Sequence, residues 1–258
     1  MIEKTEFESG TFYLGDCFEV MAALEAGSVD MILADLPYGT TACAWDSALP
    51  LPDVWNTYFK INKSNAAIVL TASQPFTTAL IASQIKYFKY SLIWDKLNRF
   101  TGAPNAKKRP MKQHEDICVF YKEQPIYNPQ FRKGVPYSTS RKGGNGQYID
   151  GLREIEDRPQ KSDGTKAYPG SIIAVHGAFG PIKQIHPTQK PIPLFEYLIR
   201  TYTNEGELVL DNTAGSGTTA IAAMNAGRRW ICIEKDETYY RAAVERVRKH
   251  EEKMREAA

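Results

Sequence analysis

The stretch Asp35-Leu36-Pro37-Tyr38 combines an acid, a rigid turn and an aromatic ring within four residues. It follows an apolar run of strand length, Met31–Ala34, and Gly39 comes directly after it. Pro37 fixes its own φ and Gly39 tolerates positive φ, so we expect the chain to turn here. In open α/β folds the carboxyl ends of the strands form the ligand-binding edge, to which this turn would bring the acid and the ring. An ordinary surface turn has the same appearance, so this stretch alone leaves both interpretations open.

A second stretch, far downstream, has the composition of a nucleotide-binding turn. An apolar run that begins at Leu208 ends in Asp211, and a Gly215-Ser216-Gly217 turn leads into a segment of helical composition. Such glycines let the backbone approach a ligand held at a helix N-terminus. The next apolar run ends in Glu234, where an acid can bind the hydroxyls of a ribose. Two alternatives remain at this point: a turn with incidental glycines, and an NAD site, although Ala220 interrupts the G-x-G-x-x-G fingerprint.

The elements that must position these residues alternate along the chain. Apolar runs with turn residues at their ends predict strands, and periodic segments between them predict helices. This alternation is typical of an α/β protein, with a parallel sheet covered by helices. The predicted strands are 11–16, 29–34, 66–71, 87–94, 115–121, 207–211 and 229–234, and the predicted helices are 17–24, 51–61, 75–85, 191–202, 217–225 and the segment from 236 onward.

Length and composition fit one α/β domain that carries an insertion, or two small domains, in a chain of 258 residues. Between Glu123 and about Gln184 the composition shifts to Pro, Gly, Tyr, Ser and basic residues, which indicates an inserted module. We therefore expect two halves of one domain, 1–122 and 185–258, around an insert, 123–184. The acidic start is unlike a signal peptide, and no apolar run is long enough to span a bilayer.

Four scattered cysteines without a Cys-x-x-Cys pair argue against disulfides and a zinc site, and favour a reducing cytoplasm. The net charge is only +2, but between Lys96 and Lys142 eleven Lys/Arg face three acids, a local excess of eight positive charges. A basic face on an otherwise acidic body is typical of a protein that binds a polyanion. A solvated charged loop is the alternative for any single residue there.

Three motifs in this order resemble the DNA amino-methyltransferases: DLPYG at 35–39, HPTQKP at 186–191 and DNTAGSGTT at 211–219. More specifically, they resemble the permuted β group, in which the catalytic tetrad precedes the S-adenosylmethionine motif. The resemblance implies a Rossmann-like S-adenosylmethionine-dependent methyltransferase fold with circularly permuted motif order. It covers both flanks of the chain and not the expected insert, where such enzymes carry their target-recognition region.

The resemblance also assigns roles, position by position. Asp35, Leu36, Pro37 and Tyr38 would form the catalytic tetrad. Glu234 would hold the cofactor's ribose, and the segment of Asp16 and Cys17 its adenine. The residues expected at the methionine end are Asp211, Thr213, Gly215, Ser216, Gly217 and Thr218, with His186, Thr188 and Lys190 beside them. On its own, His186 would be interpreted as a capping or core histidine.

Two positions depart from the pattern of the group. A bulky residue such as Phe usually stands at Thr213, so an apolar contact to the cofactor would be missing or come from elsewhere. Proline usually stands at Leu36, whose backbone carbonyl is the part expected to act, so leucine keeps the acceptor with less rigidity.

The chemistry implied is methyl transfer to an exocyclic amine of a base. Asp35 and the Leu36 carbonyl would each accept an N–H bond of the amine, and Tyr38 would stack on a base flipped out of double-stranded DNA. Packing against the loop is the alternative for Tyr38. The acid at the head of the tetrad favours adenine N6 over cytosine N4. DNA contacts are expected from the basic region, namely Lys107, Lys108, Arg109, Lys112, Arg132 and Arg141.

No metal is expected, and the source implied is a bacterium or a phage, with or without a restriction partner. The alternatives are a cytosine-N4 or RNA methyltransferase, a non-catalytic DNA-binding module of the same fold and, more distantly, a nicotinamide oxidoreductase. The sequence leaves the recognition site open, as well as the choice between monomer and homodimer.

Overall fold

The computed structural model describes residues 2–39, 48–140, 159–162, 164–177 and 189–257. The chain forms two compact units, one made of residues 1–128 and 171–258 and the other of residues 129–170. The second unit is shorter at both ends than the expected insert, since residues 123–128 and 171–177 belong with the first unit.

The first unit is built on one sheet, in which β2, β11, β10, β3 and β4 are neighbours and run parallel. The expected all-parallel sheet is wrong at β6, which runs antiparallel between β4 and β5 because a hairpin, with no crossover helix, connects it to β5. In sheet order the strands are β1 (Glu3–Glu6), β2 (Gly10–Leu14), β11 (Arg229–Glu234), β10 (Leu208–Asp211), β3 (Val29–Ala34), β4 (Asn62–Ala72), β6 (His114–Phe120), β5 (Phe88–Asp95) and β9 (Ile172–Ala174).

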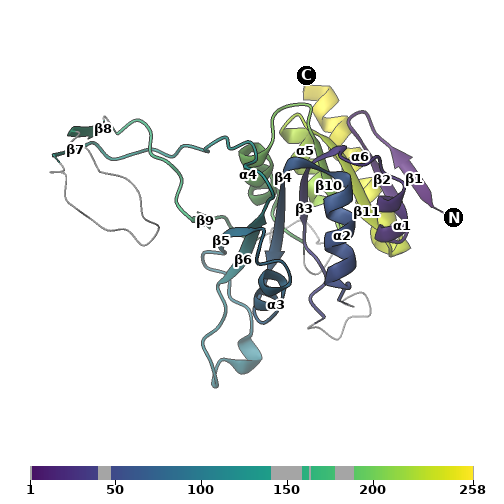
Figure 1. The fold of residues 1–258 in the computed structure, drawn as a ribbon, viewed down its shortest axis with the longest axis horizontal. Helices are drawn as coiled ribbons and strands as arrows, with labels where there is room; N and C mark the ends of the chain where they lie inside the picture. The colour runs from purple at the N-terminus through teal and green to yellow at the C-terminus, as the bar shows by residue number, and fades with distance from the viewer. Residues whose placement is uncertain (1, 40–47, 141–158, 163, 178–188, 258) are drawn as a thin grey trace. The chain divides into compact units, whose positions relative to one another are not determined.

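Helices cover both faces of this sheet (Figure 1). One face packs against α1 (Cys17–Ala22), α2 (Leu51–Ile61) and α3 (Phe76–Ser83), and the other against α4 (Ile192–Tyr202), α5 (Thr218–Asn225) and α6 (Glu237–Ala257). The side chains of β3 pack into the cores on both faces of the sheet, because successive side chains of a strand point to opposite faces. Met31 and Leu33 enter the α4–α6 core, whereas Ile32 and Ala34 enter the α1–α3 core.

The direction of the crossovers changes between β3 and β10. From β3 the chain crosses to α2 on one face, and from the adjacent parallel strand β10 it crosses to α5 on the other. Leu210 is level with Ile32, so the turns that follow the two strands leave the same edge of the sheet side by side. Such a switch point is where open α/β sheets form a ligand-binding crevice.

The second unit contains a two-stranded antiparallel sheet, β7 (Tyr137–Ser140) and β8 (Pro159–Ser162). Near its start Arg132 pairs with Ala167, and the rings of Phe131 and Tyr168 lie 5.1 Å apart. Arg132 also donates from Nε to the carbonyl of Tyr168. Among the helices of the described residues, none is long and apolar enough to cross a membrane.

Candidate active site

The two turns singled out by the sequence meet at the switch point. The hydroxyl of Thr213, in the turn after β10, donates to the backbone carbonyl of Asp35, in the turn after β3, across 3.1 Å. Thr213 stands where the group resembled by the motifs usually has a bulky residue such as Phe. The threonine supplies a hydrogen bond between the two turns.

The Asp35 carboxylate is held by three donors. Its Oδ1 accepts from the hydroxyls of Tyr38, at 2.7 Å, and Thr71, and its Oδ2 accepts from Nζ of Lys190 at 2.6 Å. A carboxylate has about four lone-pair positions, so these three bonds leave room for one more donor on Oδ2. Thr71 lies in β4, the next strand of the sheet, and was not among the residues expected at the site.

Lys190 belongs to a line of alternating buried charges. Its Nζ lies 2.6 Å from Oδ2 of Asp35 and 3.3 Å from Oε2 of Glu115, whose Oε1 lies 2.5 Å from Nζ of Lys96. Burial would lower the pKa of Lys190, but Asp35 and Glu115 outweigh it and the net shift is upward. Burial likewise opposes ionisation of Glu115, yet Lys190 and Lys96 bring its pKa below the usual value. Lys190 and Glu115 are therefore both charged at neutral pH.

Tyr38 and Leu36 fix the turn in different ways. The Tyr38 ring lies on Phe76 of α3 with centroids 5.0 Å apart and planes 24° from parallel. Burial, then the charges of Asp35 and Glu115, raises the pKa of Tyr38 well above its ordinary value, so the phenol keeps its proton and donates. The Leu36 side chain is only 2 % exposed and packs in the α1–α3 core. Burial of the Leu36 side chain thus anchors a position at which the group resembled by the motifs usually has proline, and where less rigidity was expected.

The glycine turn lies beside this carboxylate. Gly217 has a φ of +71° and is the N-cap of α5, and a Cβ there would lie 3.1 Å from atoms of Phe12 and Val247. Asp211 accepts from the backbone N–H of Thr213 at 3.1 Å and from the hydroxyl of Thr219. Burial raises the pKa of Asp211 to about 7. Its charge at neutral pH is therefore sensitive to a cation placed nearby.

Two further acids mark the neighbouring strand ends. Glu234, at the end of β11, accepts from the backbone N–H groups of Gly215, at 2.9 Å, and Asp236, at 2.8 Å. Burial raises its pKa. Asp16 follows β2 and caps α1 by accepting from the N–H of Phe18 at 2.9 Å, with Lys235 3.4 Å from its other oxygen. Cys17 is buried, and burial raises the pKa of its thiol.

Arg246 of α6, which the sequence did not single out, forms hydrogen bonds to the glycine turn. Its Nη1 donates to the carbonyl of Ser216 at 2.8 Å and to the hydroxyls of Ser216 and Thr218, both at 3.2 Å. The Thr218 hydroxyl also donates to the carbonyl of Lys190 at 3.2 Å. Burial lowers the pKa of Arg246 to about 10, so it remains a cation. No motif marks an arginine inside a helix of mixed charge, so only the fold reveals this contact.

Several expected residues lie elsewhere. His186, Thr188 and Arg141 fall outside the described residues. Lys107, Lys108 and Arg109 are exposed in the segment between β5 and β6, whereas Lys112 is half-buried and donates to the hydroxyl of Ser73. Arg132 lies in the second unit.

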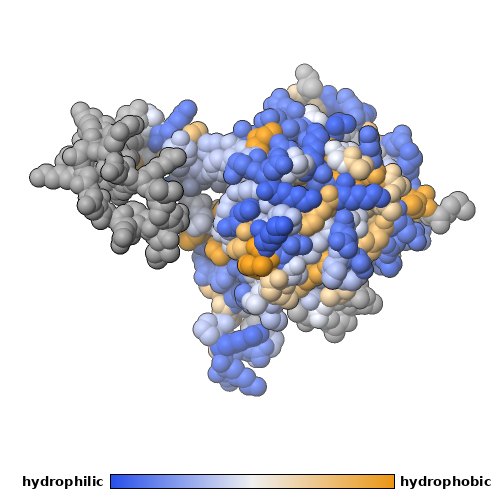
Figure 2. Space-filling view, viewed as in Figure 1, coloured by the Kyte–Doolittle hydropathy of each residue, from blue (hydrophilic) through white to orange (hydrophobic). Residues whose placement is uncertain are grey.

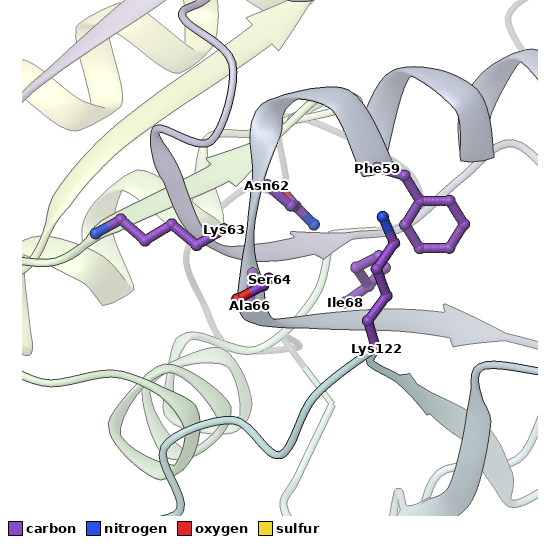
Figure 3. Close-up of a pocket in the computed structure, with 7 residues that line it drawn as sticks. All are labelled: Phe59, Asn62, Lys63, Ser64, Ala66, Ile68 and Lys122. Atoms are coloured by element: carbon purple, nitrogen blue, oxygen red, sulfur yellow. The ribbon is translucent and has the colours of Figure 1, made fainter.

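Other features of the described part of the chain lie apart from this edge. Among all the described residues, no cluster of three or more His, Cys, Asp or Glu could hold a metal ion. A pocket at the start of β4 contains the unpaired amide of Asn62, and Lys122 lies over the ring of Phe59 there (Figure 3). Asn62 pairs with Val29, the first residue of β3, so this pocket is at the opposite end of the strands from Asp35. The residues that line it are Phe59, Asn62, Lys63, Ser64, Ala66, Ile68 and Lys122.

Comparisons with known proteins agree on one family. Residues 29–245 match a family model described as "DNA methylase". The type II methyltransferase M2.LlaDCHI of Lactococcus lactis subsp. cremoris is 41 % identical, covering 95 % of this chain and 91 % of its own. The DNA adenine methyltransferase YhdJ of Escherichia coli is 25 % identical over 95 % of this chain and 85 % of its own.

Two solved structures are similar in fold. The cytosine-N4-specific PvuII DNA methyltransferase superposes with a TM-score of 0.67 at 15 % identity, over 95 % of this chain and 92 % of its own. A complex of M1.HpyAVI with S-adenosylmethionine superposes with a TM-score of 0.60 at 24 % identity, over 92 % of this chain and 98 % of its own. At these identities the likeness concerns the fold.

Proposed function

The chain belongs to the DNA methylase family, and on this basis we propose that it methylates the N6 amino group of adenine in double-stranded DNA. It is an S-adenosylmethionine-dependent DNA methyltransferase. The observation that carries the finer proposal is the bond from Thr213 to the carbonyl of Asp35, which joins the acid-bearing turn to the glycine turn.

The residues at the glycine turn fit this cofactor. S-adenosylmethionine supplies a methyl group made electrophilic by a sulfonium centre. Asp211, buried at the end of β10, suits the cationic methionine end, and Glu234 suits the ribose hydroxyls. Asp16, at the end of the next strand along, suits the adenine end. Gly217, with a φ of +71°, makes the tight turn that places a ligand at the N-terminus of α5.

Asp35 and Leu36 bind and polarise the acceptor amine. An exocyclic amine of adenine is a poor nucleophile because its lone pair is delocalised into the ring. The remaining lone pair of Asp35 Oδ2 and the Leu36 carbonyl each accept one N–H, which draws the nitrogen toward a tetrahedral geometry. Both acceptors also stabilise the positive charge that develops on nitrogen as the bond from the methyl group to sulfur breaks. The methylated amine then gives up one proton, to Asp35 or to water. Lys190, Thr71 and Tyr38 hold the carboxylate in one orientation for this task.

The target base must leave the duplex to reach Asp35, at a cost of a few kcal/mol. Tyr38 recovers about 1–3 kcal/mol by stacking on the flipped ring. Phe76 lies on the Tyr38 ring, and this contact holds the ring plane in place before the base arrives.

An acid rather than serine at the head of the tetrad favours adenine, as does the relationship to the adenine methyltransferase YhdJ. Cytosine N4 is the second candidate, because the family includes enzymes for both bases and a cytosine-N4-specific enzyme has the same fold. The bacterial relatives support a site of action on DNA in a bacterial cytoplasm. The segment from 123 to 184 is the proposed target-recognition region, and the oligomeric state stays open.

The acceptor is tested by nucleoside analysis. Mixed genomic DNA without adenine or cytosine methylation is incubated with the protein and S-adenosylmethionine, then digested to nucleosides and separated by mass. We expect N6-methyladenine and no N4-methylcytosine. The reverse result would replace adenine by cytosine as the substrate, and the absence of both products would reject the activity. Sequencing of the same DNA with modified-base detection gives the recognition site.

A further inference from the structure

The segment between β5 and β6 is a long connection, which one antiparallel bridge between Thr101 and Lys112 folds back on itself. We call residues 97–113 the basic hairpin. Thr101 N–H donates to the Lys112 carbonyl at 2.8 Å, and Lys112 N–H donates to the Thr101 carbonyl at 2.9 Å. A short 3-10 helix, η1 (Ala103–Asn105), lies near its tip. The hairpin projects beyond the ends of β5 and β6 (Figure 1).

The basic hairpin is attached to the body of the domain and also carries exposed apolar side chains. Lys112 donates from its side chain to the hydroxyl of Ser73, just after β4, and this contact fixes the base of the hairpin. Phe100 and Met111 are each one residue from the Thr101–Lys112 pair. Their exposed fractions are 51 % and 42 %. The hairpin thus presents two large apolar side chains to solvent.

Positive charge surrounds this apolar pair. Arg99, Lys107, Lys108 and Arg109 are exposed, and the basic hairpin contains no acid. Figure 2 shows its projecting tip as hydrophilic. Cations that meet phosphates around apolar groups that meet base faces are the chemistry with which proteins enter a nucleic-acid duplex.

The basic hairpin begins and ends close to the candidate active site. Ser73, which holds Lys112, is two residues from Thr71, which donates to Asp35. A duplex whose base reaches Asp35 therefore passes near the root of the hairpin. This proximity favours DNA over a membrane surface or an acidic protein as the occupant.

Resting on the proposed function, we propose that Phe100 and Met111 form an apolar wedge that enters the DNA base stack beside the target base. When the target leaves the duplex, its neighbours lose a stacking partner. An aromatic ring and a flexible thioether side chain restore part of that contact and slow the return of the base. The wedge thus acts on base flipping, and Asp35 acts on the flipped base.

The test compares two duplexes that carry the recognition site identified by modified-base sequencing. One pairs the target base normally, and the other places an abasic position opposite it, so that flipping costs less. We expect Phe100→Ala to lower kcat/KM about tenfold on the paired duplex, a typical loss for one base-stacking contact, and less than about twofold on the other. Met111→Ala should act in the same direction, and Phe100→Trp should retain activity.

Two controls separate the wedge from other effects. Lys108→Ala should weaken transfer equally on both duplexes because it affects only a phosphate contact, and thermal unfolding should match the parent in every variant. An equal loss for Phe100→Ala on both duplexes, or parental activity on both, would overturn the proposal that Phe100 and Met111 enter the base stack. Absence of methyl transfer by the unmodified protein would overturn the proposed function, and the wedge with it.

Discussion

The hydroxyl of Thr213 donates to the backbone carbonyl of Asp35 across 3.1 Å, although the two residues are 178 positions apart in the chain. The bond crosses the switch point between β10 and β3, where the crossovers leave on opposite faces of the sheet. It fixes the peptide that connects Asp35 to Leu36. A threonine at this position therefore couples the cofactor turn to the acceptor turn directly.

Replacing Thr213 with valine keeps its shape and removes the donor. We expect kcat for methyl transfer to fall about fivefold to tenfold, because a net hydrogen bond contributes about 1 kcal/mol. The dissociation constant for S-adenosylmethionine should change less than about threefold, as judged by calorimetric titration. Thr213→Ser is the matched control and should keep most of the activity. A kcat equal to that of the parent in Thr213→Val would show that this hydrogen bond does not contribute to methyl transfer.

Replacing Lys190, which is buried, with methionine leaves the partly buried Asp35 and Glu115 without their shared cation. We expect the free energy of unfolding to fall by about 3–5 kcal/mol in denaturant titrations, a typical cost of breaking a buried ion pair. Adding Glu115→Gln should recover part of that loss, since one of the two uncompensated charges is then removed.

The exposed pair of Lys235 and Asp16 provides the control for this network. Its lysine side chain is 80 % exposed, so Lys235→Met should change stability by less than about 1 kcal/mol. Equal effects of Lys190→Met and Lys235→Met would contradict the buried charge network.

The affinity for S-adenosylmethionine should rise with pH between about 6 and 7.5. Burial raises the pKa of Asp211 to about 7, so below that pH most of the free protein carries a neutral acid. A cationic ligand favours the ionised form, and binding then releases a proton. The association constant should increase by up to about tenfold per pH unit below the pKa and level off above it.

Calorimetry at several pH values, in buffers of different ionisation enthalpy, measures both the affinity and the proton released. Asp211→Asn should flatten the profile. A pH-independent affinity in the parent protein would show that Asp211 does not bind the cationic end of the cofactor.

DNA binding should weaken steeply as salt rises, because cations on the protein replace counterions on the phosphates. Lys107, Lys108 and Arg109 are exposed on the basic hairpin. We expect Lys108→Ala to reduce the slope of log K against log salt by about one. Fluorescence anisotropy with a labelled mixed-sequence duplex measures this slope. A flat response in the parent would reject a phosphate-binding role for the hairpin.

The sequence predicted the elements that depend on local sequence patterns. Val29–Ala34 was predicted as a strand from its apolar run Met31–Ala34 and β3 has the same bounds, and the Gly-Ser-Gly turn lies before a helix as expected. Partners that come from other strands were not predicted. Thr71 ends an apolar run just as Asp35 does, yet only the pairing of β3 with β4 brings the two together.

Glu115 was missed because its role depends on strand direction. It lies near the start of β6, and only an antiparallel β6 brings that start to the edge where the parallel strands end. The bridge in the basic hairpin was not predicted, because a single residue pair, Thr101 and Lys112, leaves no alternation in the sequence. Lys112 was expected on a phosphate, and the fold directs it to Ser73 instead.

The account depends on Asp35 as the group that binds the reacting amine. Radiolabelled methyl transfer from S-adenosylmethionine to mixed genomic DNA, measured for the parent and for Asp35→Ala, tests this directly, with cofactor titrations on the same preparations. We predict that the variant transfers no methyl group above background, while its affinity for S-adenosylmethionine stays within a few-fold of the parent. Turnover retained in Asp35→Ala would contradict the mechanism.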